Sequence, residues 1–225
     1  LSNQARELSI QCNNLRLSSP PLIRGTQAVY FSAIFSQGWG RQELVDIQTQ
    51  FLQDLLERKE QIEKHMSVND THRILWLHLP PFYDRELLNY IEVECNAPIV
   101  FEEVNYVGWD PLDPDDPLRS LSKKLLQSGF LNPDDRVRTI SKNAKRANFN
   151  GCILYNHGFG RCSMSDASFV KHLREELTEK GLPLLVLDGD CVDPTIDPCS
   201  TYTKVSSYIE SLNSKKFGNI FGPLK

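Results

Sequence analysis

Short apolar runs alternate with amphipathic helical patterns from residue 73 onward. The apolar runs have the length of buried strands and lie at 73–78, 98–101, 151–155 and 184–187. The helical patterns that follow them lie at 83–94, 118–127, 134–148, 165–180 and 201–212. Repeated strand-helix units with short connections predict an α/β fold. We expect a four-stranded, parallel, Rossmann-like sheet flanked by helices, with strand order 2-1-3-4.

The first seventy residues follow a different pattern. Residues 1–19 are polar, with a short helical stretch at Ala5–Cys12, and they lead into the helix-breaking Pro20-Pro21, so we interpret them as a linker or arm. The apolar run 26–35 fits a strand or a buried helix, and we favour the helix. Gln42–Met66 is an amphipathic helix. The expected division is a linker and N-terminal helical arm, an α/β domain and a C-terminal tail, at 1–70, 71–215 and 216–225.

Composition and charge narrow the range of partners. The 225 residues carry a formal net charge of -4, with Lys and Arg scattered, which is not the pattern of a nucleic-acid binder. No apolar run is long enough to span a membrane, and the N-terminus does not resemble a secretory signal. Six unevenly spaced cysteines suggest reduced thiols in the cytoplasm. The chain begins at Leu1, and we therefore expect that further sequence precedes it.

Candidate chemistry gathers where the third and fourth strands end. Both strands give way abruptly to Gly, Asp, His and Cys, as α/β domains do at the carboxyl ends of their strands. Cys162 follows Gly158-Phe-Gly160, and the adjacent Arg161 favours a thiolate. The alternative is that Cys162 is a small buried residue. We predict one cleft that contains Leu79, Asn105, His157, Cys162 and Cys191.

The same residues also allow other interpretations. His157, Cys162 and Cys191 could form a zinc site, but a fourth ligand is not evident. Asp188, Asp190 and Asp193 could bind a cation, although we predict that Asp188 and Asp190 accept backbone hydrogen bonds in a turn. Cys152 is expected to pack in the core, while Cys12, Cys95 and Cys199 lack metal-ligand spacing. No phosphate-binding glycine motif is present, which argues against tight nucleotide binding by this chain alone.

Several segments resemble a known family. Leu187-Asp-Gly-Asp-Cys-Val-Asp-Pro194, the preceding Gly181-Leu-Pro-Leu-Leu-Val and the helix to Leu212 look like the carboxyl-terminal part of a subunit of the (R)-2-hydroxyacyl-CoA dehydratase and benzoyl-CoA reductase family. Asp135-Arg136 through Asn150-Gly151-Cys-Ile-Leu, and Cys162-Ser163, resemble the third strand and the late cluster cysteine of that family. The resemblance covers about residues 18–215.

The resemblance implies a lyase of anaerobic metabolism that binds a 4Fe–4S cluster. In the family, a cluster between two α/β domains serves an acyl-CoA substrate, and an ATP-hydrolysing iron-sulfur activator injects one electron. The resulting ketyl radical expels the hydroxyl group. Cys162 is the implied metal ligand, and no catalytic residue is assigned. Compared with the family, we expect the first domain with its two cysteines to be missing from this chain, and the loop from Gly151 to Cys162 to be slightly longer.

The resemblance therefore implies three partners: the acyl-CoA substrate, a second dehydratase subunit in a heterodimer, and the activator. We expect the protein in the cytoplasm, and its composition predicts neither nucleic acid nor a membrane as a partner. The other cluster ligands would come from outside this chain, and Cys191 would be a bystander. Two alternatives remain open. The chain could be a non-catalytic or degenerate subunit of the same fold, or it could be a subunit of the benzoyl-CoA reductase type.

Overall fold

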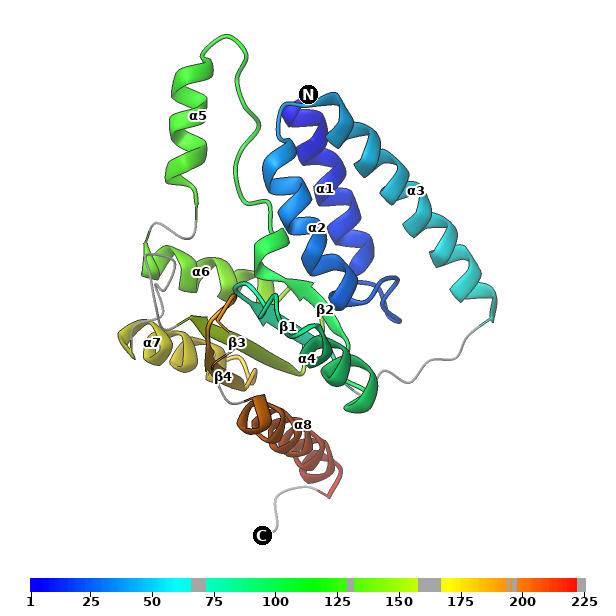
Figure 1. Ribbon diagram of the computed structural model, residues 1–225, viewed down its shortest axis with the longest axis vertical. Helices are drawn as coiled ribbons and strands as arrows, with labels where there is room; N and C mark the ends of the chain where they lie inside the picture. The colour runs from blue at the N-terminus through cyan, green and yellow to red at the C-terminus, as the bar shows by residue number, and fades with distance from the viewer. Residues whose placement is uncertain (66–71, 129–131, 158–166, 194, 196–197, 222–225) are drawn as a thin grey trace.

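Four strands form one parallel sheet in the middle of the molecule (Figure 1). The computed structural model describes residues 1–65, 72–128, 132–157, 167–193, 195 and 198–221. The strands are β1 (Ile74–Leu77), β2 (Ile99–Glu102), β3 (Gly151–His157) and β4 (Leu184–Gly189). All pairings are parallel, and the order is β2-β1-β3-β4. The predicted fold class and strand order are confirmed.

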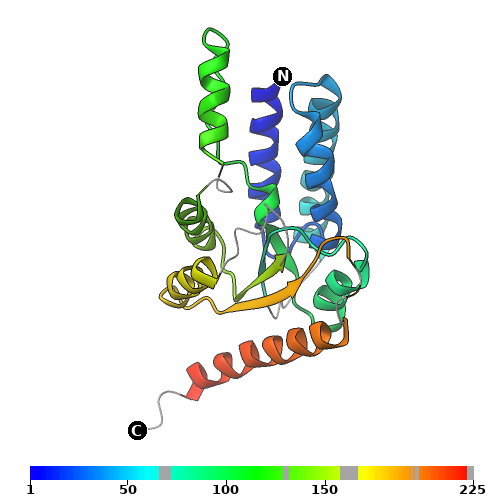
Figure 2. The same ribbon diagram turned by 60° about the vertical axis from the view of Figure 1, so that its left-hand side comes forward.

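Helices cover both faces of the sheet (Figures 1 and 2). One face carries α6 (Pro133–Ala144) and α7 (Ala167–Thr178), and the other carries α4 (Arg85–Asn89) and α8 (Pro198–Phe221). Side chains alternate between the faces along each strand, as the pleat requires. In β1, Ile74 and Trp76 pack in the cluster with α4 and α8, whereas Leu75 and Leu77 pack in the cluster with α6 and α7. Both clusters are therefore built from apolar strand residues.

Cap residues explain where the helices over the α6–α7 face begin and end. The Asn132 side chain accepts a hydrogen bond from the Asp134 N–H at 2.9 Å, and Pro133 occupies the first turn of α6. Asp134 and Asp135 place negative charge at the positive end of that helix dipole. Beyond α7, Gly181 has φ +71°, a left-handed conformation that glycine adopts without steric cost.

The N-terminal segment is an integral helix, so the predicted N-terminal helical arm is confirmed, and of the two interpretations of residues 1–19, linker or arm, the linker does not hold for most of the segment. Helix α1 runs Ser2–Arg16, beyond the expected Ala5–Cys12, and it packs beside α3 (Gln42–His65). Its buried positions follow a helical spacing, but most are polar: Ala5, Ser9, Cys12, Asn13 and Arg16. A search for apolar periodicity misses such a stripe. Helix α2 (Gly25–Gly38) forms from the ambiguous apolar run, as favoured.

Several boundaries differ from the expected ones by a few residues. Strands β3 and β4 each continue two residues past the apolar run, to His157 and Gly189. Helix α4 continues directly as a π-helical turn, η1 (Tyr90–Glu94), and β2 continues as a 3₁₀ turn, η2 (Glu103–Asn105). Helix α6 ends at Ala144, and α8 extends on both sides of 201–212.

Helix α5 (Pro117–Leu126) stands apart from the sheet layers (Figures 1 and 2) and buries none of its residues. Leu118, Leu121, Leu125 and Leu126 are all exposed, from 45% to 79%. It bonds to the loop that precedes it, where Lys123 pairs with Asp110 at 2.6 Å and the Ser120 hydroxyl group donates to the Asp113 carbonyl at 3.3 Å. Within the described residues, no helix is both long enough and apolar enough to cross a membrane.

Candidate functional site

Polar side chains meet where β1, β3 and β4 end. His78 directly follows β1, His157 is the last residue of β3, and Asp190 directly follows β4. Parallel pairing places His157 opposite Gly189 in the register. The His78 and His157 rings lie 4.3 Å apart between centroids, and both residues are buried. We call His78, Glu103, Arg136, Tyr155, His157 and Asp190 the strand-end cluster.

The His157 imidazole is held in one tautomer. Its Nε2 lies 3.0 Å from the Leu79 carbonyl oxygen, and a carbonyl only accepts, so Nε2 carries the proton. Nδ1 is then the unprotonated nitrogen, and it has no hydrogen-bond partner among the residues that the structure describes. Burial lowers the pKa of His157 and outweighs the opposing effects of the Leu79 hydrogen bond and of Asp190, while Arg136 adds a smaller lowering effect. The side chain is therefore neutral at pH 7 and can accept a proton at Nδ1.

Tyr155 closes the cluster on the β4 side. Its hydroxyl group lies 3.2 Å from the Asp190 carbonyl oxygen and 3.3 Å from the Tyr83 hydroxyl group. Its ring stands edge-on to His157 at 5.2 Å. A Cβ atom at Gly189 would collide with the Tyr155 hydroxyl oxygen, so glycine is required there. Burial raises the pKa of Tyr155, which keeps the phenol protonated and able to donate.

A buried ion pair fixes the position of His78. Arg136 donates to both carboxylate oxygens of Glu103, from Nε at 2.7 Å and from Nη2 at 2.8 Å. The second oxygen of Glu103 also accepts from the His78 backbone N–H at 2.9 Å. His78 has φ +70°, which is costly for a residue with a side chain. The bidentate pair stabilises this strained turn, and the guanidinium group also packs 4.8 Å from the Phe169 ring.

The acidic residues after β4 serve the local turn. The Asp190 carboxylate accepts from the backbone N–H groups of Val192 at 2.8 Å and Asp193 at 3.1 Å, which confirms its predicted role. These two bonds lower the pKa of Asp190. The prediction for Asp188 is wrong, because its carboxylate accepts from the side-chain amide of Asn156 at 2.9 Å. Asp188 faces the neighbouring strand, since β4 extends past it.

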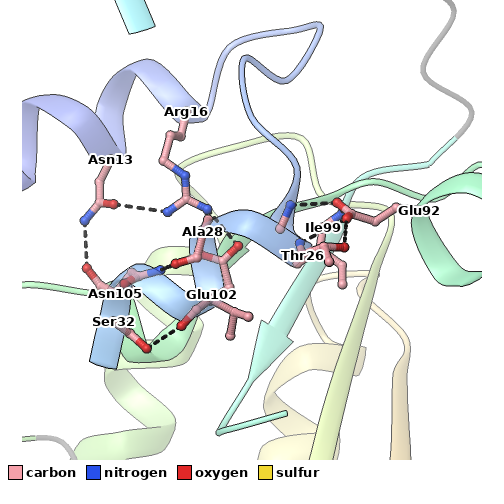
Figure 3. A network of polar contacts seen from close by, with 11 residues as sticks. Asn13, Arg16, Thr26, Ala28, Ser32, Glu92, Ile99, Glu102 and Asn105 are labelled. Atoms are coloured by element: carbon pink, nitrogen blue, oxygen red, sulfur yellow. Dashed lines mark hydrogen bonds and ion pairs between the residues drawn. The ribbon is translucent and has the colours of Figure 1, made fainter. Parts of the chain in front are cut away.

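The described residues bring together only part of the set that was predicted to share one cleft. Leu79 and His157 are hydrogen-bonded, and Cys191, half-buried beside Asp190, accepts through its carbonyl from the Phe82 N–H at 2.8 Å. Asn105 does not join them. Its side chain donates to the Ala28 carbonyl at 3.0 Å and to Glu102 at 2.8 Å, so it turns toward the N-terminal helices (Figure 3). The position of Asn105 after the end of β2 therefore does not determine the direction of its side chain.

Cys162 lies outside the described residues, together with Gly158, Gly160, Arg161 and Ser163. Its predicted proximity to Cys191, its role as a cluster ligand and the zinc alternative with His157 stay predictions. Cys152 is buried in β3, as expected, and burial raises the pKa of its thiol. Among the side chains that the structure describes, no group of three His, Cys, Asp or Glu residues is placed to hold a metal ion.

Sequence reasoning missed four members of the cluster as site residues: His78, Glu103, Arg136 and Tyr155. His78 and Glu103 do follow apolar strand runs directly, which was a usable signal. Nothing local predicts that Arg136 pairs with a glutamate 33 positions earlier.

A family comparison covers nearly the whole described chain. The family model HGD-D, described as 2-hydroxyglutaryl-CoA dehydratase, D-component, matches residues 1–212. The match spans the N-terminal helices, the sheet, the strand-end cluster and the segment that contains Cys162. No curated protein matches the chain. The fold and this match agree with the resemblance found in the sequence, and the chain belongs to the 2-hydroxyglutaryl-CoA dehydratase, D-component family.

Proposed function

We propose that this chain is part of an iron-sulfur subunit of a 2-hydroxyacyl-CoA dehydratase, and that Cys162 is its ligand to a 4Fe–4S cluster. The family match supports a dehydratase component that works with partner subunits. The structural observation that carries the proposal is His157, a buried neutral imidazole with an unprotonated nitrogen. It immediately precedes the segment 158–166, in which Cys162 is the only thiol.

The described residues fit a cluster whose ligands come from more than one domain or polypeptide better than a cluster held by this chain alone. A 4Fe–4S cluster takes thiolate ligands. The described cysteines do not form a group of metal ligands, and Cys12, Cys95 and Cys152 belong to other parts of the fold. Cys162 would therefore be one ligand, and an upstream domain or another polypeptide would supply the rest. This division of ligands matches a component that functions only in a complex.

The cluster, when bound, would supply single electrons to the acyl-CoA thioester. The residues of this chain would manage protons. Eliminating water from a 2-hydroxyacyl group removes a proton from carbon as well as the hydroxyl group, so the reaction needs a base. We assign this role to His157, which is neutral at pH 7 and accepts at Nδ1. Tyr155 and the Leu79 carbonyl hold the imidazole in its orientation and tautomer.

The ligand assignment is tested by replacing cysteines in the complete anaerobic complex with its partner subunit. Cys162→Ser is expected to remove the visible absorption of the cluster, the bound iron and sulfide, and dehydration activity, because a serine oxygen is a poor substitute for a thiolate. The matched control is Cys191→Ala, which removes a half-buried thiol shortly after β4 and should leave all of these largely intact.

Full iron and sulfide content in Cys162→Ser would show that Cys162 is not a ligand. A complex in which this subunit contributes to no cluster at all would favour the non-catalytic alternative.

A further inference from the structure

Helix α5 turns its polar side toward the rest of the protein and its leucines toward solvent. Lys123 pairs with Asp110 at 2.6 Å in the loop that precedes the helix. The Lys124 ammonium group lies 4.1 Å from the centroid of the Trp109 ring. Helical spacing centres four exposed leucines, which we call the leucine stripe, on the other side of α5: Leu118, Leu121, Leu125 and Leu126. Amphipathic helices normally bury such a stripe, and its exposure is typical of an interaction surface.

The two ends of α5 carry opposite charge. Residues 113–116, which we call the tip, precede the helix and contain three exposed acidic residues and no basic one: Asp113, Asp115 and Asp116. A hollow of about 640 Å³, which we call the basic hollow, lies between the C-terminal end of α5 and helix α6. Four basic and two acidic side chains line it: Lys124, Arg136, Arg138, Lys142, Glu103 and Asp135. Each acidic residue pairs with an arginine of α6, so the positive charges of the two lysines remain in surplus.

The leucine stripe connects these two charged ends. Asp116 directly precedes α5, while Leu125 and Leu126 line the basic hollow at its other end. The helix between them has ten residues and therefore spans about 15 Å. A second α5 that lies antiparallel against the first brings each tip to the basic hollow of the other copy and places the two leucine stripes face to face. A parallel pairing would instead place aspartates beside aspartates, so the charges favour the antiparallel one.

We propose that two copies of this chain associate through antiparallel α5 helices related by a two-fold axis. Each copy contributes the same surface, so the contact closes on itself and stops at the dimer. The leucine stripes supply the apolar contact, and the acidic tips supply charges complementary to the basic hollows. This surface stands clear of the sheet layers (Figures 1 and 2), so a second copy can reach it. The inference goes beyond the proposed function, because it requires neither an iron-sulfur cluster nor a substrate.

Sedimentation velocity of the full chain measures this association. We expect monomer at about 1 µM and mostly dimer at about 200 µM, because a contact of two short helices is smaller than a standard interface and binds weakly. Leu118→Gln should weaken the dimer at least about tenfold, since the symmetric contact loses two leucines. Leu56→Gln makes the same change at an exposed leucine of α3 and should leave the association unchanged. Monomer at every concentration, or equal association of the two variants, would overturn the proposal.

Charge-reversed variants test the antiparallel arrangement. Asp115→Lys with Asp116→Lys makes the tip positive, and Arg138→Glu with Lys142→Glu makes the basic hollow negative, all at exposed positions. Each double variant alone should dimerise at least about tenfold less tightly, because like charges then meet. An equimolar mixture of the two should dimerise again, since each tip then meets a hollow of opposite charge. A mixture that associates no better than its components would overturn the arrangement. If either double variant fails to fold, the comparison of Leu118→Gln with Leu56→Gln decides.

Discussion

His157 shows how one residue can be prepared for chemistry by its surroundings. The Leu79 carbonyl selects the tautomer, burial keeps the ring neutral, and the edge-on Tyr155 ring limits its rotation. Tyr155 lies two positions before His157 in β3, but Leu79, which follows β1, lies 78 positions away in the sequence. The residue type was recognisable in the sequence as a candidate, but its protonation state was not.

The lowered pKa of His157 predicts a pH dependence of stability. In the unfolded chain an exposed histidine has a pKa of about 6.5. Below that pH the unfolded state binds a proton at His157 more readily than the folded state does. The free energy of unfolding should therefore fall as pH decreases from about 6.5 to the lower folded pKa, by about 1.4 kcal/mol for each unit of difference.

Urea unfolding at a series of pH values measures this effect. His157→Gln keeps an amide donor for the Leu79 carbonyl but does not titrate, and it should flatten the pH dependence in this window. His172→Gln, at a histidine whose side chain is 47% exposed on α7, controls for loss of an imidazole at the surface. An unchanged pH dependence in His157→Gln would contradict the assignment.

At the scale of elements, the apolar patterns in the sequence predicted the strands and helices that pack through apolar side chains. The four strands and most helices were recognised, because their buried residues are Leu, Ile, Val and Phe. For helix α1 only a short helical stretch in a linker or arm was predicted, because its buried stripe contains Ser9, Asn13 and Arg16, whose partners lie far along the chain. A polar stripe signals burial only once those partners are known. Likewise Asn156 and His157 extend β3 through pairing with β4, not through hydrophobicity.

The Arg16–Glu102 pair predicts a large cost for removing one partner. Both side chains are almost completely buried, so Arg16→Met would leave the Glu102 carboxylate without its cation, at a cost of about 3–5 kcal/mol in the free energy of unfolding. The double variant Arg16→Met with Glu102→Gln should recover part of this loss, because the buried charge is then absent.

Arg41→Met is the matched control for the same experiment. Its partner Glu43 lies 3.6 Å away, and both side chains are about two-thirds exposed, so the expected cost is below about 1 kcal/mol. Denaturant unfolding of the four proteins decides the prediction. If Arg16→Met costs no more than Arg41→Met, the buried pair does not hold α1 against β2.

At the scale of the whole molecule, the N-terminal helix is joined to a segment far along the chain. Helix α1 is tied to the segment after β2 by Asn3, which exchanges two hydrogen bonds with Leu112 at 2.8 and 2.7 Å, and by Arg6, which donates to the Trp109 carbonyl at 2.7 Å. These contacts join residues about a hundred positions apart.

The isolation of α5 has a consequence for the rate of amide hydrogen exchange. A ten-residue helix without buried side chains lacks the packing that normally stabilises helices, and so it opens at almost no free-energy cost. Deuterium uptake in α5 should be at least about a hundredfold faster than in α7, a helix of similar length that buries Phe169, Leu173 and Leu177. Equal protection of the two helices from exchange in the dilute, monomeric chain would contradict this prediction, because the exposed leucines of α5 would then have to be covered in solution.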